Sequence, residues 1–136
     1  MTPLPEIIDS HAGREGPLLP ILHDVQAEHG HVSEAAIREI AQALNLTRAE
    51  VYGVVSFYHD FKTAPEARPI VRLCRAEACQ ARGVDALIAV ADGQSRVKVE
   101  PVYCLGLCAV GPAAMIGNTV HARLDPVGFA ALIGAA

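Results

Sequence analysis

Apolar side chains recur every three or four positions through residues 1–62, which predicts amphipathic helices rather than strands. Ser33 and Thr47 stand where helix N-caps are expected, and Thr47 with Glu50 has the form of a capping box. The expected helices cover Pro5–His11, Leu18 to about Gly30, Ser33–Leu44 and Thr47–Tyr58. Residues 1–62 are therefore predicted to form a bundle of three to four helices.

The pattern changes after a polar stretch at residues 63–69, which contains two prolines and is the expected linker. Residues 70–136 then begin with short β-like runs, and the chain has no internal repeat. The expected elements are strands at Ile70–Leu73 and Val97–Glu100, a helix between them that opens at Cys79, a hairpin of Ala114–Ile116 with Val120–Arg123, and a last helix at Pro126–Ile133. A strand, a crossover helix and a second strand favour a parallel pair. This order predicts a thioredoxin-like α/β domain over residues 70–136.

Composition supports a folded protein whose partner is another protein. Apolar residues make up 51% of the chain and charged residues 19%, which excludes a wholly disordered chain. Residues 1–62 carry four Lys and Arg against nine Asp and Glu, a net charge of −5, whereas residues 63–136 have a net charge of +1. The acidic half favours a protein partner over nucleic acid.

Residues 33–58 also have the outline of a DNA-binding helix-turn-helix. Over this stretch two arginines are outnumbered by three glutamates, so a recognition helix would lack a basic surface. A helical bundle for docking is the better interpretation.

The start of the chain has acids, two prolines and no apolar core of a signal peptide. No apolar run approaches the roughly 20 residues that span a bilayer. We therefore expect a cytoplasmic protein without membrane insertion, and in that compartment clustered cysteines serve more often as ligands than as disulfides.

All four cysteines lie in two short loops, Cys74-x4-Cys79 and Cys104-x3-Cys108, and each loop follows a predicted strand. Two adjacent loops of this kind can bring four thiolates to one centre. We interpret that centre as a [2Fe–2S] cluster, which moves electrons, with Cys74 and Cys79 on one iron and Cys104 and Cys108 on the other.

Four thiolates, two ferric ions and two sulfides carry a net charge of −2, which the protein must offset with backbone N–H groups. Gly106 and Gly111 flank Cys108 and are expected to curl the second loop inward with positive φ. Cys79, at the expected start of a helix, would gain from the helix dipole, and Arg75 and Arg82 are near in sequence.

Other uses of the cysteines remain open. A structural zinc site of all four is the strongest alternative, although zinc pairs are usually spaced near C-x2-C. A redox dithiol normally has C-x-x-C, which neither pair matches. The six histidines are expected to be solvated or structural, and nothing has the form of a Rieske centre. A four-cysteine zinc module for protein interaction, or a free-standing redox sensor, are therefore the competing functions.

The segments Cys74–Gln80 and Val99–Met115 closely resemble the gamma subunit of soluble, molybdenum-containing, NAD-dependent formate dehydrogenases. More broadly, the chain is similar to the 24-kDa [2Fe–2S] subunit of respiratory complex I and its counterpart in NAD-linked hydrogenases. Gly16–Pro20 and Val54–Tyr58 resemble the helical region of the same superfamily. The formate dehydrogenase branch is favoured by Arg75–Ala78 and by the residues around Cys104.

The resemblance implies an N-terminal helical bundle and a thioredoxin-like ferredoxin domain, with Cys74, Cys79, Cys104 and Cys108 as the ligands of one [2Fe–2S] cluster. It also implies a partner subunit that carries FMN and reacts with NAD, and a large subunit that holds molybdenum and oxidises formate. The chain itself would bind neither FMN nor molybdenum. It would be an electron-transfer subunit of an oxidoreductase without catalysis of its own.

Overall fold

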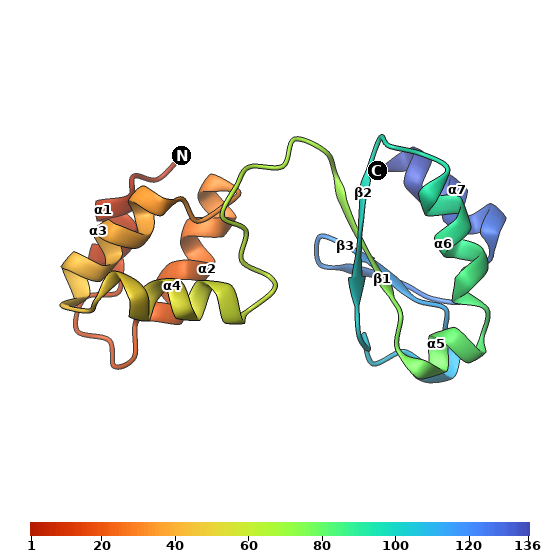
Figure 1. Cartoon of the computed structure of the whole chain (residues 1–136), viewed down its shortest axis with the longest axis horizontal. Coiled ribbons are helices and arrows are strands. Elements are labelled where there is room, and N and C mark those ends of the chain that lie inside the picture. The colour runs from red at the N-terminus through yellow and green to blue at the C-terminus, as the bar shows by residue number, and fades with distance from the viewer. The chain divides into compact units, whose positions relative to one another are not determined.

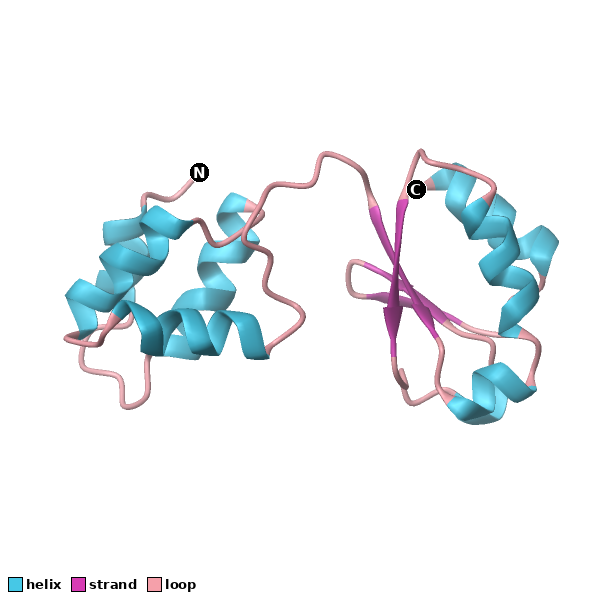
Figure 2. Ribbon diagram, viewed as in Figure 1, coloured by secondary structure: helices cyan, strands magenta, loops and turns pink.

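The computed structural model describes all 136 residues, which form two compact units, Met1–Glu66 and Ala67–Ala136. Figure 1 shows the two units along the chain, and the division falls inside residues 63–69. The first unit, called the helical unit below, is all helical, whereas the second, called the sheet unit, combines helices with strands (Figure 2). Each unit has its own core of buried apolar side chains.

Four helices make up the helical unit, as the predicted bundle requires. They are α1 (Leu4–Ser10), α2 (Leu18–His29), α3 (Glu34–Leu44) and α4 (Arg48–Phe57). The side chain of Ser33 accepts from the N–H of Ala36 at the start of α3. Thr47 and Glu50 form a reciprocal capping box at the start of α4. These capping side chains fix where α3 and α4 begin, because they bond backbone N–H groups that have no partner within the helix.

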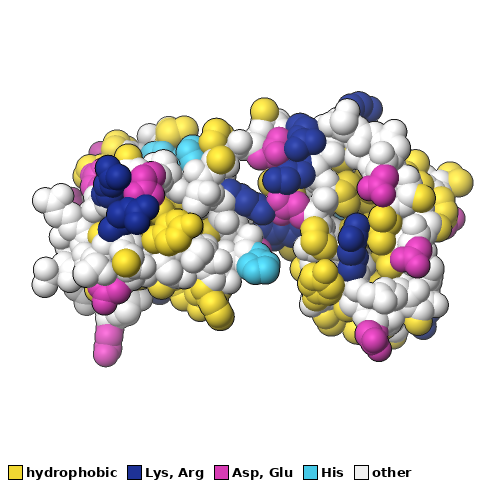
Figure 3. Space-filling model, in the orientation of Figure 1, with side chains coloured by type: hydrophobic (Ala, Val, Ile, Leu, Met, Phe, Trp, Pro, Cys, Tyr) yellow, Lys and Arg dark blue, Asp and Glu magenta, His cyan; other side chains and the backbone are white.

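Basic and acidic side chains lie next to one another on the helical unit (Figure 3). Both Arg38 and Arg48 pair with the carboxylate of Glu34. The two arginines of the possible helix-turn-helix are therefore already paired within the protein. This agrees with the expectation that a recognition helix here would lack a basic surface.

The sheet unit has four strands in the order β2-β1-β3-β4. Its elements are β1 (Ile70–Cys74), α5 (Glu77–Ala81), α6 (Val84–Asp92), β2 (Lys98–Val102), the 3-10 helix η1 (Cys108–Val110), β3 (Ala114–Ile116), β4 (Thr119–His121) and α7 (Pro126–Ala135). Strands β1 and β2 are parallel, as predicted, whereas β3 pairs with β1 and β4 in antiparallel fashion. The predicted mixed α/β class and the thioredoxin-like order of elements are confirmed.

Helices α6 and α7 contact each other on one side of the sheet (Figure 1). Phe129 of α7, Leu87 of α6 and Leu73 of β1 are almost completely buried between these layers. Packing of these side chains fixes the position of β1 in the sheet. It thereby also fixes where the chain leaves the strand, at Cys74. None of the helices is long and apolar enough to cross a membrane.

Candidate metal centre

The register of the parallel strands brings the two cysteine loops together. Cys74 is the last residue of β1, and its register partner is Val102, the last residue of β2. Parallel strands point their carboxyl ends to the same edge of a sheet, so the two loops begin side by side. The backbone N–H of Cys104 accordingly donates to the Sγ atom of Cys74 over 3.4 Å. All four predicted residues therefore lie at one edge of the sheet.

Cys74 and Cys79, called the inner pair below, are each only 2% exposed. The two thiols are close enough for each to influence the pKa of the other. The N–H of Cys74 donates to the carbonyl oxygen of Ala113 over 3.0 Å, which ties the inner pair to the segment before β3. Both sulfurs consequently belong to the packed interior of the sheet unit.

Cys104 and Cys108, called the outer pair below, are exposed. Their sulfurs are 3.6 Å apart, close to the edge of about 3.8 Å that a tetrahedral metal with metal–sulfur bonds of about 2.3 Å requires. The N–H of Gly106 points at the Sγ atom of Cys104 over 3.4 Å. Gly106 has φ +76° and Cys104 itself has φ +80°, so the loop curls around sulfur as predicted.

The thiols differ in acidity because their surroundings differ. Burial raises the pKa of the Cys74 thiol, but hydrogen bonds from the backbone N–H groups of Ala76 and Cys104 outweigh it and hold that pKa below its ordinary value. Burial and the neighbouring Cys74 raise the pKa of Cys79. The hydrogen bond with Cys104 raises the pKa of Cys108. Backbone donors are thus arranged around a sulfur in a way that stabilises a thiolate.

Two details of the predicted site were wrong. Cys79 does not open the crossover helix, because it lies within the short helix α5, and a second helix, α6, begins at Val84 after a break at Gly83 with φ +93°. Gly111 does not have positive φ; its φ is −65°. The reason for glycine at this position is the space beside Cys79, since an added β-carbon would lie 3.0 Å from the Cys79 sulfur.

The thiols form two neighbouring pairs. No three Cys, His, Asp or Glu side chains of the chain are placed to hold one metal ion. Two neighbouring pairs of thiols fit a centre with two metal ions, each held by one pair.

Comparison with known proteins identifies the family to which this chain belongs. The sequence profile described as "Thioredoxin-like [2Fe-2S] ferredoxin" matches residues 4–136. The chain belongs to the thioredoxin-like [2Fe–2S] ferredoxin family. A relative from Rhizobium meliloti, which is a subunit of an NADH-quinone oxidoreductase, is 30% identical over 131 residues, and these are 88% of this chain and 78% of the relative.

Other relatives of the chain come from hydrogenases. The NADP-reducing hydrogenase subunit HndA of Solidesulfovibrio fructosivorans is 28% identical over 132 residues, covering 89% of this chain and 77% of the relative. A crystal structure of an NAD⁺-reducing [NiFe]-hydrogenase in the H2-reduced state matches with a TM-score of 0.71 and 30% identity over 87% of this chain. This chain spans only 22% of that hydrogenase chain.

The cofactor of a thioredoxin-like [2Fe–2S] ferredoxin is one [2Fe–2S] cluster, and the donor set of this chain fits it. Four thiols stand in two pairs, and backbone N–H groups of Cys104 and Gly106 already point at sulfur. Sulfur ligands with amide donors around them are what such a cluster needs in order to be held and tuned.

Sequence reasoning missed the role of Ala113. Its carbonyl oxygen accepts from the N–H of Cys74, and its backbone N–H lowers the pKa of Cys79, which burial raises. An alanine that acts through its backbone has no signal in a single sequence.

Of the two predicted arginines, Arg82 lies against the space between Gly111 and Cys79, whereas Arg75 lines a separate cavity of about 290 Å³ with Asp92 and Lys98.

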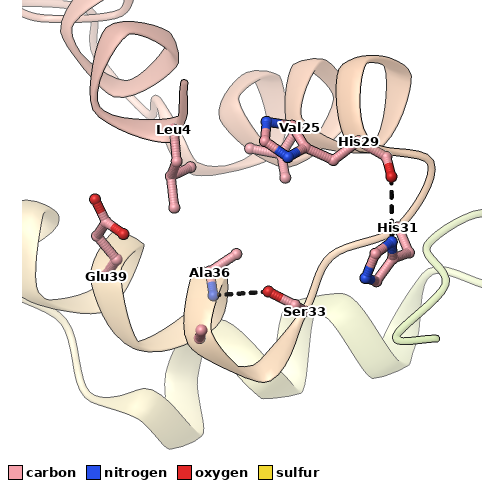
Figure 4. A pocket seen from close by; sticks show the side chains of 8 residues that line it. Leu4, Val25, His29, His31, Ser33, Ala36 and Glu39 are labelled. Carbon is pink, nitrogen blue, oxygen red and sulfur yellow. Dashed lines mark hydrogen bonds between the residues drawn. The ribbon is translucent and has the colours of Figure 1, made fainter. Parts of the chain in front are cut away.

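The helical unit has an open cavity of its own, of about 210 Å³ (Figure 4). Leu4 and Val25 line it together with His29, His31 and Ser33. The serine and the two histidines are already bonded to the protein: Ser33 accepts from Ala36, His31 pairs with the carbonyl of His29, and His29 pairs with the carbonyl of Thr2. The carboxylate of Glu39 also lines the cavity.

Proposed function

We propose that Cys74, Cys79, Cys104 and Cys108 are the ligands of the [2Fe–2S] cluster, with the inner pair on one iron and the outer pair on the other. In this proposal the chain is an electron-transfer subunit of an NAD-linked oxidoreductase. The single observation that carries it is the arrangement of four thiols as two adjacent pairs at one sheet edge, one pair buried and one exposed.

The exposed outer pair gives electrons a way in or out. Residues 101–120 contain no Asp, Glu, Lys, Arg or His, and Tyr103 in this stretch is 70% exposed. An uncharged, partly apolar stretch beside a redox centre suits docking of a protein partner, because little charge has to be desolvated on contact. We propose that the partner's flavin approaches the cluster on the side of this stretch.

The residues of this chain have two tasks in the transfer. When bound, a [2Fe–2S] cluster would supply one-electron chemistry, with a net charge of −2 when oxidised and −3 when reduced. The N–H groups of Cys104 and Gly106 would stabilise the added negative charge at the sulfurs. Burial of the inner pair keeps water from that side of the site, and the exposed outer pair leaves the other side open to the partner.

For the finer assignment we propose the gamma subunit of a molybdenum-containing, NAD-dependent formate dehydrogenase. Its support is the similarity of Arg75–Ala78 and of the residues around Cys104 to that branch. The partners would be an FMN-bearing subunit that reacts with NAD and a large molybdenum subunit that oxidises formate. The corresponding subunit of an NAD-linked hydrogenase or of complex I is the second candidate, favoured by the names of the relatives and by the matched hydrogenase structure.

The cluster is tested by anaerobic purification of the full chain. We expect a brown protein with about two irons and two acid-labile sulfides per chain and an EPR signal after reduction that is typical of a [2Fe–2S] centre. A colourless protein with one zinc per chain would overturn the proposal and support the zinc-binding interaction module. A stable chain that holds a cluster but binds no flavoprotein would support a redox sensor.

The partners are tested by tagging the chain in its native host and purifying what remains bound. Formate-dependent reduction of NAD⁺ by the purified complex, lost when formate is omitted, is the result expected for a formate dehydrogenase. Reduction of NAD⁺ by hydrogen, or oxidation of NADH by a quinone, would assign the chain to the second candidate. Molybdenum and FMN contents of the complex give an independent readout.

A further inference from the structure

A cavity of about 290 Å³ in the sheet unit carries an excess of positive charge. The end of α6, the start of β2 and the two arginines that flank β1 line it. Its cations are Arg68, Arg75 and Lys98, and its one carboxylate is that of Asp92. Lys98 also pairs with Glu100 over 3.3 Å, and the cations still outnumber the carboxylates when this residue is counted. No cysteine lines the cavity, so it is separate from the metal centre.

The Nε atom of Arg75 lacks a partner inside the chain. It is buried and makes no hydrogen bond, although the carboxylate of Asp92 lines the same cavity. Buried polar atoms of this kind are rare in folded proteins, and an ordered water or an ion is a usual reason for one. The cavity is the space beside Arg75 from which such a partner can come.

The wall between α6 and β2 is held in place by hydrogen bonds within the chain. The side chain of Gln94 donates to the carbonyl oxygens of Ala91 and Val97 and accepts from the N–H of Val97 over 3.0 Å. The N–H of Lys98 donates to the carbonyl oxygen of Pro69 over 2.8 Å, which joins the two strand starts. The backbone around the cavity is therefore already formed, and a ligand would have to order side chains alone.

The arrangement of the cations selects the chemical class of the ligand. They come from three places along the chain, namely before β1, after β1 and at the start of β2. A tetrahedral oxyanion presents oxygens in several directions, whereas a carboxylate presents two in one plane. Arginine binds phosphate through two parallel N–H bonds, for which Nε and a terminal nitrogen of Arg75 are suited. A volume just below the range of about 300–1,000 Å³ for ligand pockets fits a small ligand.

We propose that this cavity binds a phosphate group, either of inorganic phosphate or of a phosphate ester, with Arg75 as the main contact and Arg68 and Lys98 as supporting cations. Asp92 and the negative end of the α6 dipole lie on the same side and oppose an anion, so binding depends on the three cations together. The inference does not depend on the proposed function, because neither the cavity nor its test involves the cysteines.

The test is calorimetric titration of the full chain with inorganic phosphate at constant ionic strength. We expect saturable binding of one phosphate per chain. Arg75→Gln should weaken it at least about tenfold, the effect of losing a hydrogen bond to a charged group. The matched control is Arg96→Gln, which removes the same charge near the cavity without lining it, since Arg96 bonds to the carbonyl of Gly134 over 3.3 Å. This control should bind phosphate as the wild-type chain does.

Arg75→Lys separates the guanidinium from its charge. It keeps the positive charge but loses the Nε donor, so its affinity for phosphate should lie between those of the wild-type chain and Arg75→Gln. Wild-type affinity in Arg75→Lys would overturn the role of the guanidinium. Equal losses in Arg75→Gln and Arg96→Gln would show general attraction to a basic surface and overturn the site.

Thermal unfolding gives a second readout. Phosphate should raise the unfolding temperature of the wild-type chain, because a ligand that binds the folded state stabilises it, and should not raise that of Arg75→Gln. If Arg75→Gln does not fold, Arg75→Lys and Lys98→Gln decide by calorimetry. Wild-type affinity for phosphate in both of these variants would overturn the proposal.

Competition with three probes identifies the source of the phosphate group. Tighter binding of AMP than of inorganic phosphate would assign the site to a phosphate ester, and weaker binding would assign it to free phosphate. Adenosine, which lacks the phosphate, should not compete. Acetate that binds as tightly as phosphate would assign the cavity to a carboxylate of a protein partner and overturn the proposal. No saturable binding up to about 10 mM phosphate, which would fill about 90% of a site with a Kd of about 1 mM, would also overturn it.

Discussion

The inner and outer cysteine pairs provide the same atoms but lie in different surroundings. Cys74 and Cys79 are part of the core of the sheet unit, among apolar residues of β1 and α6. Cys104 and Cys108 belong to a loop that is largely open to solvent. The inner pair is therefore held in place by the packed core, whereas the position of the outer pair depends on local backbone geometry. Substitutions in the two halves should therefore fail in different ways.

The largest effect is expected for Cys74→Ser. Loss of a ligand should abolish the [2Fe–2S] signal, and a hydroxyl in this buried position should also lower the free energy of unfolding of the cluster-free chain by about 1–3 kcal/mol. Iron analysis and urea unfolding followed by circular dichroism measure the two effects. If the cluster-free variant were as stable as the wild-type chain, the inner pair would contribute no more to the stability of the fold than the outer pair.

Cys104→Ser should remove or strongly perturb the EPR signal while leaving the cluster-free chain within about 0.5 kcal/mol of wild-type stability, because the side chain is exposed. His31→Ala, in the helical unit, is the control and should leave the signal intact. A wild-type spectrum in Cys104→Ser would remove this residue from the ligand set.

The reactivity of the cluster-free chain should separate the pairs without any substitution. Iodoacetamide should modify the outer pair at least about tenfold faster than the inner pair, because buried thiols react only when the structure opens locally. Mass spectrometry of the peptides reports each site. Equal rates would mean that the inner pair is not part of the stable core.

The pH dependence of the same reaction sharpens the comparison. The hydrogen bond with Cys104 raises the pKa of Cys108, so at pH 8 less of Cys108 is thiolate than in an ordinary cysteine. Alkylation of Cys108 should keep increasing with pH above the ordinary cysteine pKa of about 8.5, and Cys104→Ser should accelerate it at pH 8. An unaltered pH profile in that variant would contradict the coupling between the two thiols.

The smallest effect is expected for Gly106→Ala. Gly106 has φ +76° with open space around it, so the substitution costs about 1 kcal/mol of backbone strain and creates no clash. A cost of this size should speed the release of iron to a chelator about fivefold without abolishing the cluster. Release at the wild-type rate would show that the curl of the outer loop does not depend on glycine.

Features with a local cause were predicted well from the sequence. The caps at Ser33 and Thr47 and the strand at Ile70 depend on neighbouring residues, and the structure has them where the pattern placed them. The second strand was less well placed: it was expected at Val97–Glu100 but covers Lys98–Val102, because pairing with β1 decides where it ends. That shift of the strand end matters, since it brings Cys104 next to Cys74.

The sequence by itself determined that four cysteines belong to two loops, that each loop follows a strand, and that a helical unit precedes them. Spacing and periodicity are properties of neighbours along the chain, so a single sequence contains them. Only the tertiary structure decided that one pair is buried and the other exposed, that the carbonyl of Ala113 accepts from Cys74, and that Gly111 is glycine for space and not for its backbone angles. Those facts arise from contacts between residues far apart in the chain, which packing of the sheet against α6 and α7 brings together.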